Sequence, residues 1–525
     1  MVRSAFQKGL IFVLLVIILA GGALFVTRLW PADSFSKEEA QHALYGLWIY
    51  KDLKNLDWAG FWYDTQRQMF WPFLHSWFQA FFFLLFGVSY LSARLLSFAA
   101  FVALLILMYL ISAKISEKDG WKIGIGSVLL VLTSPIAVRY ACENTLEVGG
   151  ALLFLISFYL YVVCQERKVL LYYIPLAFLL GLSFFYNYLY AYLMLPAFLV
   201  ATLAKLGPIT RVSFRLKRQG ENAALPFLWW AYRKMVVLTV LLLLAASWFF
   251  SAAFSRKILI FTQAVFRNLE GIRIANFGQS LFYYPWAIIR YYTFSPWLGI
   301  LILISLFLPF IALHYWRLGK LYTFVWTVLI LSTLTIPTKA PQFIFLIAPF
   351  LFIIFSATLV YFIEKNEFFF VKPRAKALIL LLILLPSLFS WKTLKELYFV
   401  SPPKERMVQV LDYFHQAVSP RFPVAMVVNL QHLNPEGISF HFWDWNAPVL
   451  IDLLVGEGEI LKTTRYFFSV EIDPQSPYQQ EILDSSSFRW NEVLKAWLGA
   501  GLIREYSERR FSSLGLTAKI YEKQK

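Results

Sequence analysis

The sequence predicts a polytopic α-helical membrane protein with a small α/β domain at its C-terminal end. Of its 525 residues, 59% are hydrophobic and 19% aromatic, and only 15% are charged. A soluble globular chain carries about 25% charged residues. Apolar runs long enough to cross a bilayer recur along the chain, and in lipid such runs form helices because every backbone polar group must be satisfied internally.

Charge-free apolar runs predict about eleven spans. The first follows a basic N-terminus, as in a signal peptide, but it is long enough to span and has no evident cleavage site, so we expect an uncleaved helix. The predicted spans are residues 9–27, 95–113, 123–138, 148–164, 169–186, 189–204, 235–254, 297–316, 321–337, 343–363 and 377–391.

The distribution of basic residues predicts the orientation. With the N-terminus placed in the cytoplasm, the predicted inside segments hold 20 Lys and Arg in 68 positions, and the outside segments before residue 392 hold 13 in 125. This bias follows the positive-inside rule. The net charge of +17 is therefore explained by basic residues in cytoplasmic loops, which are attracted to anionic membrane lipids. We expect no nucleic-acid partner. The loop Lys205–Lys234 is the strongest cytoplasmic anchor.

Two domains are expected, a membrane domain at 1–391 and a soluble extracytoplasmic domain at 392–525. In the second, short apolar runs at 423–430, 447–455 and 466–472 predict strands, and residues 407–418 and 491–503 have helical spacing. We expect the protein in the plasma membrane (the inner membrane of a bacterium), with the C-terminal domain outside.

The first hydrophilic break, residues 28–94, is the predicted active-site segment, since it holds six carboxylates among aromatic residues. Ser36 to Glu39 has the form of a capping box that opens an amphipathic helix at the outer interface. Glu39 then has two candidate roles, a cap or a catalytic carboxylate. Glu38 is either a general base or a solvated carboxylate of the first turn. His42 lies one turn later and is a candidate for binding substrate, either bonded to Glu38 or on the wet face.

Four cations are candidates for binding an anionic lipid phosphate. Arg67 and Arg94 follow in the same break, and the alternative for each is interfacial anchoring. Arg139 lies on an outside turn before Glu147, a carboxylate close to hydrocarbon that is either a cap or functional. Lys339 is isolated on a short outside turn and either binds an anion or snorkels.

The chain lacks several motifs that would indicate other chemistry. We find no phosphate-cradling glycine loop, nucleophile elbow or metal motif such as HExxH. ATP-driven transport is therefore not expected, and no cofactor is indicated, although a divalent metal ion is possible. The outside loop 255–296 combines basic residues and tyrosines, as in sugar and phosphate binding or in an ordinary aromatic belt.

These residues resemble polytopic glycosyltransferases of the GT-C fold, in the superfamily of protein O-mannosyltransferases and lipid A aminoarabinose transferases. The resemblance covers residues 1–391 in order. The sequence departs from the family pattern in having Glu38-Glu39 for the usual Asp-Glu and Trp71-Pro72 for Pro-Pro. The matching segments are Glu38 to Ala43, Pro72 to Trp77, Phe86 to Ser89, Ala93 to Leu95, Thr145 to Glu147, and Lys339 with Phe343 and Pro349.

The resemblance implies transfer of a sugar from a polyprenyl-phosphate donor to a glycan, lipid or protein acceptor on the outer face. Glu38 would take the proton of the acceptor hydroxyl as its oxygen attacks the anomeric carbon, with inversion. The cations, with Arg67 and Lys339 foremost, would stabilise the departing phosphate.

Two other hypotheses remain from the sequence. The first is a transporter or flippase for a lipid-linked glycan. It would need charged residues along a path within the spans, and these are nearly absent. The second is a non-catalytic assembly subunit, for which the Glu in place of Asp is an argument.

Overall fold

A computed structural model describes most of the chain. It describes residues 2–524 except 31–32, 69–70, 117, 168–172, 219–239, 241–258, 261, 264–271, 275, 312–317, 365–390, 400–403, 420, 428–429, 446–448, 451–456, 477 and 480–485. Nearly all of the predicted spans 235–254 and 377–391 therefore lies outside the described residues, as do Arg256, Lys257 and Arg267.

The chain forms two compact units, each assembled from separate stretches. Unit 1 comprises Met1–Phe25, Thr65–His75 and Ser97–Val400, and unit 2 comprises Val26–Asp64, Ser76–Leu96 and Ser401–Lys525. Most of the first hydrophilic break therefore packs with the C-terminal residues. The expected domain boundary at residue 391 stays a prediction.

Unit 1 is helical. Its elements are α1 (Val2–Leu24), most of α5 (Tyr90–Ile115), α6 (Gly120–Leu132), α7 (Pro135–Cys142), α8 (Glu147–Arg167), α9 (Tyr173–Tyr186), α10 (Tyr188–Arg218), α13 (Phe277–Ala287), η3 (Ile288–Tyr292), α14 (Pro296–Ile311), α15 (Gly319–Thr335), η5 (Pro341–Ile347), α16 (Ala348–Glu364) and α18 (Trp391–Tyr398). A π-helical turn, η1 (Phe25–Leu29), follows α1. The strands β1 (Ile272–Arg273) and β2 (Thr338–Lys339) form a short antiparallel pair.

The helices confirm a polytopic membrane protein and refine the predicted spans. Among the described residues, Ser4–Leu29, Tyr90–Ile115 and Pro341–Ile363 are long and apolar enough to cross a membrane. The predicted span 123–138 is instead a pair of helices, α6 and α7, bent by 71°. The predicted span 189–204 continues as α10 to Arg218, into the expected loop. Further apolar helices are shorter, and the count of eleven spans stays a prediction.

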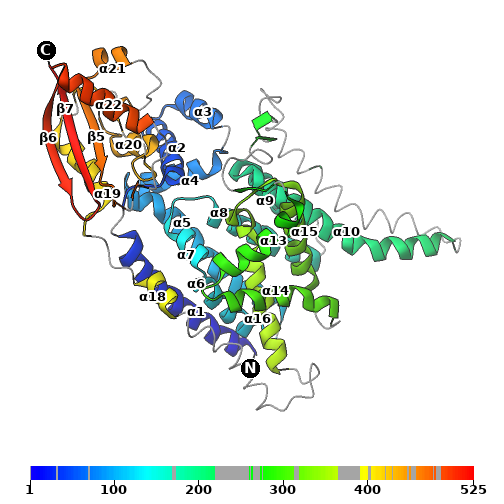
Figure 1. Ribbon diagram of the computed structural model, residues 1–525. Helices are drawn as coiled ribbons and strands as arrows, with labels where there is room; N and C mark the ends of the chain where they lie inside the picture. The colour runs from blue at the N-terminus through cyan, green and yellow to red at the C-terminus, as the bar shows by residue number, and fades with distance from the viewer. Residues whose placement is uncertain are drawn as a thin grey trace. The chain divides into compact units, whose positions relative to one another are not determined.

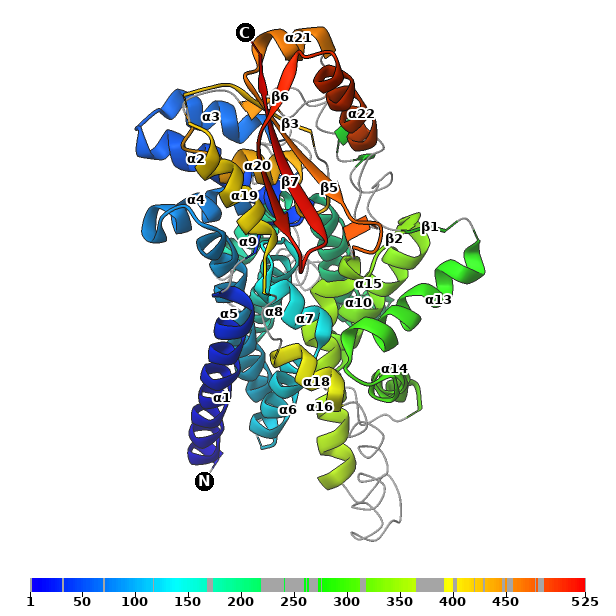
Figure 2. The ribbon, with the colours of Figure 1, turned by 60° about the vertical axis from the view of Figure 1, so that its left-hand side comes forward.

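Phenylalanine rings fill the interior of unit 1. Phe154 and Phe158 of α8 meet Phe324 of α15 and Phe350 of α16, with ring centroids 5.0 to 5.6 Å apart. Small residues let other helices approach closely. Helix α6 packs along α16 (Figure 2). A Cβ on Gly126 of α6 would lie 3.0 Å from the side chain of Ser356 in α16. Aromatic contacts of this kind add to the burial of the rings themselves.

Unit 2 combines helices of the first break with a C-terminal α/β sheet. The break holds α2 (Lys37–Lys54), α3 (Trp58–Arg67) and α4 (Leu74–Phe86), where one amphipathic helix was expected. The apolar stripe of α2 was expected to lie in the membrane interface, but it packs on protein. Ala40, Ala43 and Leu47 are buried with Phe83 of α4 and Phe440 of the C-terminal part.

The C-terminal part is a five-stranded mixed sheet in the order β4-β3-β5-β7-β6. The predicted strands are found as β3 (Val424–Met426), β4 (Val449–Leu450) and β5 (Tyr466–Ile472), parallel to one another. The antiparallel β6 (Ile503–Phe511) and β7 (Leu516–Lys523) were not predicted, and they run beside β5 in Figure 1. The helices are α19 (Met407–Ala417), α20 (Pro435–His441), α21 (Glu457–Thr463) and α22 (Ser486–Gly499).

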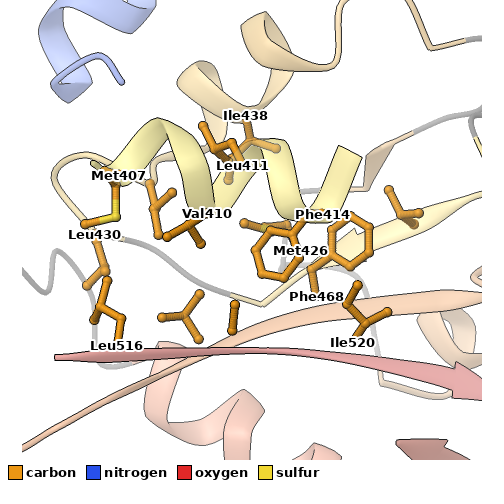
Figure 3. Close-up of a cluster of buried hydrophobic side chains, with 14 of the residues drawn as sticks. Met407, Val410, Leu411, Phe414, Met426, Leu430, Ile438, Phe468, Leu516 and Ile520 are labelled. Atoms are coloured by element: carbon orange, nitrogen blue, oxygen red, sulfur yellow. The ribbon is translucent and has the colours of Figure 1, made fainter. Parts of the chain in front are cut away.

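One hydrophobic core joins this sheet to α19. Phe414 stacks on Phe468 of β5 with ring centroids 4.6 Å apart, Met426 and Ile520 lie beside the pair, and Met407 lies beside Leu430 at the other end of the same core, as Figure 3 shows. A second core, with Trp490 and Leu494 of α22, packs on Ala425 and Phe467, which alternate with residues of the first core along β3 and β5. The small α/β domain predicted for the tail is therefore confirmed.

Candidate active site

In unit 2, the first turn of α2 carries Glu38 and Glu39. The predicted capping box is present, with the backbone N–H of Ser36 donating to Glu39 Oε2 over 3.1 Å. Glu38 precedes Glu39 in the same turn and its side chain is half-buried. The positive end of the helix dipole favours the ionised form of a carboxylate at this position, which is the form that a general base needs.

Arg94 holds Glu39 in place. Its Nε donates to Glu39 Oε1 over 2.8 Å and its Nη2 to Glu39 Oε2 over 3.0 Å, in a buried, two-pronged ion pair. Nη1 and Nη2 also donate to the carbonyls of Asp33 and Ser34. Catalysis by Glu39 and phosphate binding by Arg94 stay predictions, while the geometry favours a structural role for both.

His42 is buried and only 1% exposed, so its placement on a wet face was wrong. It lies on the face of α2 that packs into unit 2, together with Ala43 and Gly46. At Gly46 the helix approaches α4 so closely that a Cβ would overlap the side chain of Gln79. Substrate binding by His42 stays a prediction.

In unit 1, Glu147 is the first residue of α8 and only 5% exposed. Its Oε2 is buried and has no hydrogen-bond partner among the described residues. The next turn carries Gly149 and Gly150, where a Cβ would overlap the rings of Tyr186 and Tyr190. Two tyrosine rings therefore pack directly against the backbone at the start of α8.

A buried histidine fixes the chain just before Glu147. His75 Nε2 lies 3.2 Å from Asn144 Oδ1, and His75 Nδ1 lies 3.3 Å from the hydroxyl of Tyr186. The sequence left His75 ambiguous, indicated Asn144 only as a cap for the helix that begins near Glu147, and did not single out Tyr186. The three residues come from segments predicted to lie at the same membrane face, and the structure brings them together.

Lys339 is an internal cation, 1% exposed. Its Nζ donates to the carbonyls of Ser332, Thr333 and Ile336, so all three ammonium hydrogens have acceptors at the C-terminal end of α15. Burial lowers the pKa of Lys339 to about 8. Snorkelling to the interface is therefore wrong for this residue, and phosphate binding stays a prediction that the three carbonyl contacts do not favour.

Arg139 and Arg67 are exposed. Arg139 Nε donates to Glu143 Oε1 over 2.8 Å within one helical turn, and such exposed pairs contribute little to stability. Arg67 ends α3. Both side chains are accessible to a ligand, and phosphate binding by either stays a prediction.

A metal site is not formed by the described residues, because no group of three or more His, Cys, Asp or Glu side chains among them is placed to hold an ion. Use of a divalent metal ion stays a prediction.

Comparisons with known proteins agree on the fold. Residues 71–217 match the family model of dolichyl-phosphate-mannose-protein mannosyltransferases. No curated protein sequence matches the chain. Crystal structures of ArnT from Cupriavidus metallidurans are similar, in the apo state (TM-score 0.58, 13% identity, 97% of both chains) and bound to undecaprenyl phosphate (TM-score 0.58, 14% identity, 97% of this chain and 98% of that one).

The GT-C resemblance predicted from the sequence is therefore confirmed by two independent comparisons. The matched family model covers the last third of the first break, α5 to α9 and nearly all of α10. The likeness to ArnT extends over both units, including the C-terminal sheet. This chain is a membrane protein with a GT-C fold like that of ArnT.

Proposed function

We propose that the protein is a membrane glycosyltransferase. It moves a sugar from a polyprenyl-phosphate donor to a glycan, lipid or protein acceptor at the outer face of the plasma membrane. The observation that carries this proposal is the likeness to ArnT over 97% of the chain, which includes a structure of that protein with undecaprenyl phosphate bound.

The reaction is a single displacement with inversion. The acceptor oxygen attacks the anomeric carbon, the bond from that carbon to the phosphate oxygen breaks, and the polyprenyl phosphate leaves with the electron pair. Glu38 accepts the proton of the acceptor hydroxyl. The support for Glu38 is its place in the first turn of α2, where the helix dipole favours a negative charge and the neighbouring ion pair of Glu39 and Arg94 ties this turn to α5.

The other candidate groups take different roles. Glu147 is the second carboxylate for acid–base work, because its buried and incompletely bonded oxygen is costly to keep. Arg67 and Arg139 are the cations for the leaving phosphate, since both are exposed. Arg94 and Lys339 are committed to internal contacts and act as scaffold.

The test uses purified protein in liposomes with a panel of undecaprenyl-phosphate hexoses and pentoses and envelope extract as acceptor. Mass spectrometry detects free undecaprenyl phosphate and the glycosylated product. We expect transfer from one donor with the wild type and none with Glu38→Gln, at unchanged folding and insertion.

The controls separate the rival functions. Asp57→Asn, at an exposed carboxylate after α2, is the matched change of charge and should leave transfer intact. Movement of the lipid across the bilayer without transfer would indicate a transporter. Normal turnover in both Glu38→Gln and Glu147→Gln would overturn the site assignment.

A further inference from the structure

The residues that lead into α2 are tied to the C-terminal part of unit 2. Asp33 Oδ1 accepts a hydrogen bond of 2.9 Å from the backbone N–H of Val408, in the first turn of α19. A carboxylate at the start of a helix satisfies a donor that has no partner within the helix and complements the helix dipole. Asp33 therefore acts as a cap for a helix that lies far from it in the sequence.

A second link runs in the opposite direction. Asn434 is fully buried, and its Nδ2 donates to the carbonyl of Phe35 over 3.3 Å. Its Oδ1 accepts from the N–H of Gly437 over 2.7 Å and so caps α20. Phe35 immediately precedes Ser36, the cap of α2, so one amide side chain joins the starts of two helices.

Packing reinforces these two links. The ring of Phe35 lies 4.9 Å from that of Phe440 in α20. A Cβ on Gly437 would be 3.6 Å from Cβ of Ala40, so the backbone of α20 runs close to α2. At the other end of α2, Lys51 Nζ donates to the carbonyl of Trp443 over 3.0 Å.

We propose that the C-terminal domain positions the first turn of α2, with Asp33 and Asn434 as the positioning residues. The inference rests on the proposed function, in which this turn carries the base Glu38. The sheet and its helices then serve transfer by holding the carboxylate in one place, since a small displacement of a catalytic group costs much of its effect.

The experiment measures hydrogen exchange of amides 36–44 and turnover in the full-length protein. Asp33→Ala removes the acceptor for Val408, whereas Asp33→Asn retains an oxygen there. Asn434→Ala removes all three hydrogen bonds of the amide, whereas Asn434→Asp retains the cap of α20 and loses the Nδ2 donor to the carbonyls of Phe35 and Gln431. Asp473→Ala breaks an exposed ion pair with Arg510 inside the C-terminal domain and is the control.

We expect exchange at 36–44 to rise at least roughly fivefold in Asp33→Ala, Asn434→Ala and Asn434→Asp, because each loses a hydrogen bond worth about 1 kcal/mol. Asp33→Asn and Asp473→Ala should resemble the wild type. Turnover should follow the same order, with kcat lowered and the donor KM unchanged, which a general loss of folded protein would not produce.

The outcomes distinguish this inference from the proposed function. Unchanged exchange at 36–44 in all three variants would overturn the positioning role, whatever Glu38→Gln does. Faster exchange at full kcat would overturn it also, provided that Glu38→Gln is inactive. If Glu38→Gln turns over normally, the proposed function fails, and exchange alone then decides whether the C-terminal domain holds this turn.

Discussion

Two buried carboxylates of this protein have opposite surroundings. Glu39 in unit 2 is 2% exposed and both of its oxygens are bonded, by Arg94 and by the start of its own helix. Glu147 in unit 1 is 5% exposed, and its Oε2 has no hydrogen-bond partner among the residues that the structure describes. Burial by itself therefore does not separate a structural carboxylate from a functional one.

The difference lies in how the buried charge is compensated. A charge that is fully paired holds the fold together, and losing one partner is costly. A buried carboxylate with an unbonded oxygen lowers the stability of the fold. Such a group is typical of sites that bind a ligand or transfer a proton. Four predictions test this contrast.

The largest effect is expected for Arg94→Met. The change leaves the Glu39 carboxylate buried without its cation, and stability should fall by about 3–5 kcal/mol, measured by thermal and denaturant unfolding in detergent. Arg139→Met, at an exposed ion pair, should cost less than about 1 kcal/mol. The double change with Glu39→Gln should recover much of the loss, and equal effects at both arginines would contradict the assignment.

Glu147→Gln should lower turnover and leave stability unchanged, in contrast to the loss of stability expected for Arg94→Met. Turnover in the liposome assay should fall by about 10²-fold or more if the group transfers or holds a proton, while the unfolding transition stays in place, because a neutral amide of the same shape is easier to bury. Glu143→Gln, in the neighbouring exposed pair, is the control. A less stable protein with full turnover would assign Glu147 a structural role.

Lys339→Met tests whether this cation has a structural role, as argued for Glu39, or a functional role, as argued for Glu147. The change removes the donor to three carbonyls at the end of α15, so stability should fall by about 1–3 kcal/mol. Lys320→Met, at the other end of the same helix, provides a comparison. A fall in turnover of more than about tenfold at unchanged stability would instead place Lys339 on the phosphate.

The smallest effect concerns His441 at the end of α20. Burial, together with the nearby His415, lowers its pKa to about 4, although Asp412 lies 3.5 Å from Nε2 and Asp444 acts in the opposite direction. The hydroxyl of Tyr90 lies 3.1 Å from its Nδ1. The folded ring is therefore neutral at physiological pH despite its acidic neighbours.

The unfolded chain takes up this proton near pH 6.5 and the folded chain only near pH 4. Stability is therefore lost as the pH falls through this window, on the order of 1–2 kcal/mol by pH 5. Unfolding of the wild type and of His441→Gln, followed from pH 7 to 5, measures it. The same slope in both proteins would exclude His441 as the source.

The local features of the candidate active-site segment, residues 28–94, were predictable from sequence. Ser36 and Glu39 stand at the spacing of a capping box, and the structure has that box. The pairing of Glu39 with Arg94 was not predictable, because nothing local relates residues on two different helices. The same holds for His75, Asn144 and Tyr186, which meet only in the folded chain.

The C-terminal sheet shows a similar division. Strand β7 has apolar residues at Leu516, Ala518 and Ile520, and other residues at the positions between them. This alternation is typical of a strand with one buried face. The edge strand β6 is exposed along most of its length and rich in charges, so it has no such alternation. The helix expected at 491–503 ends at Gly499, and Gly501, with φ of +69°, leads into β6.

The joint packing of residues 26–64, 76–96 and 401–525 restricts the topology of the whole chain. Segments that share one folded core must lie at the same face of the membrane, so the polypeptide between Leu96 and Ser401 must cross the bilayer an even number of times. The ten spans predicted after the first helix satisfy this parity, and a revised assignment that adds or removes a single crossing does not.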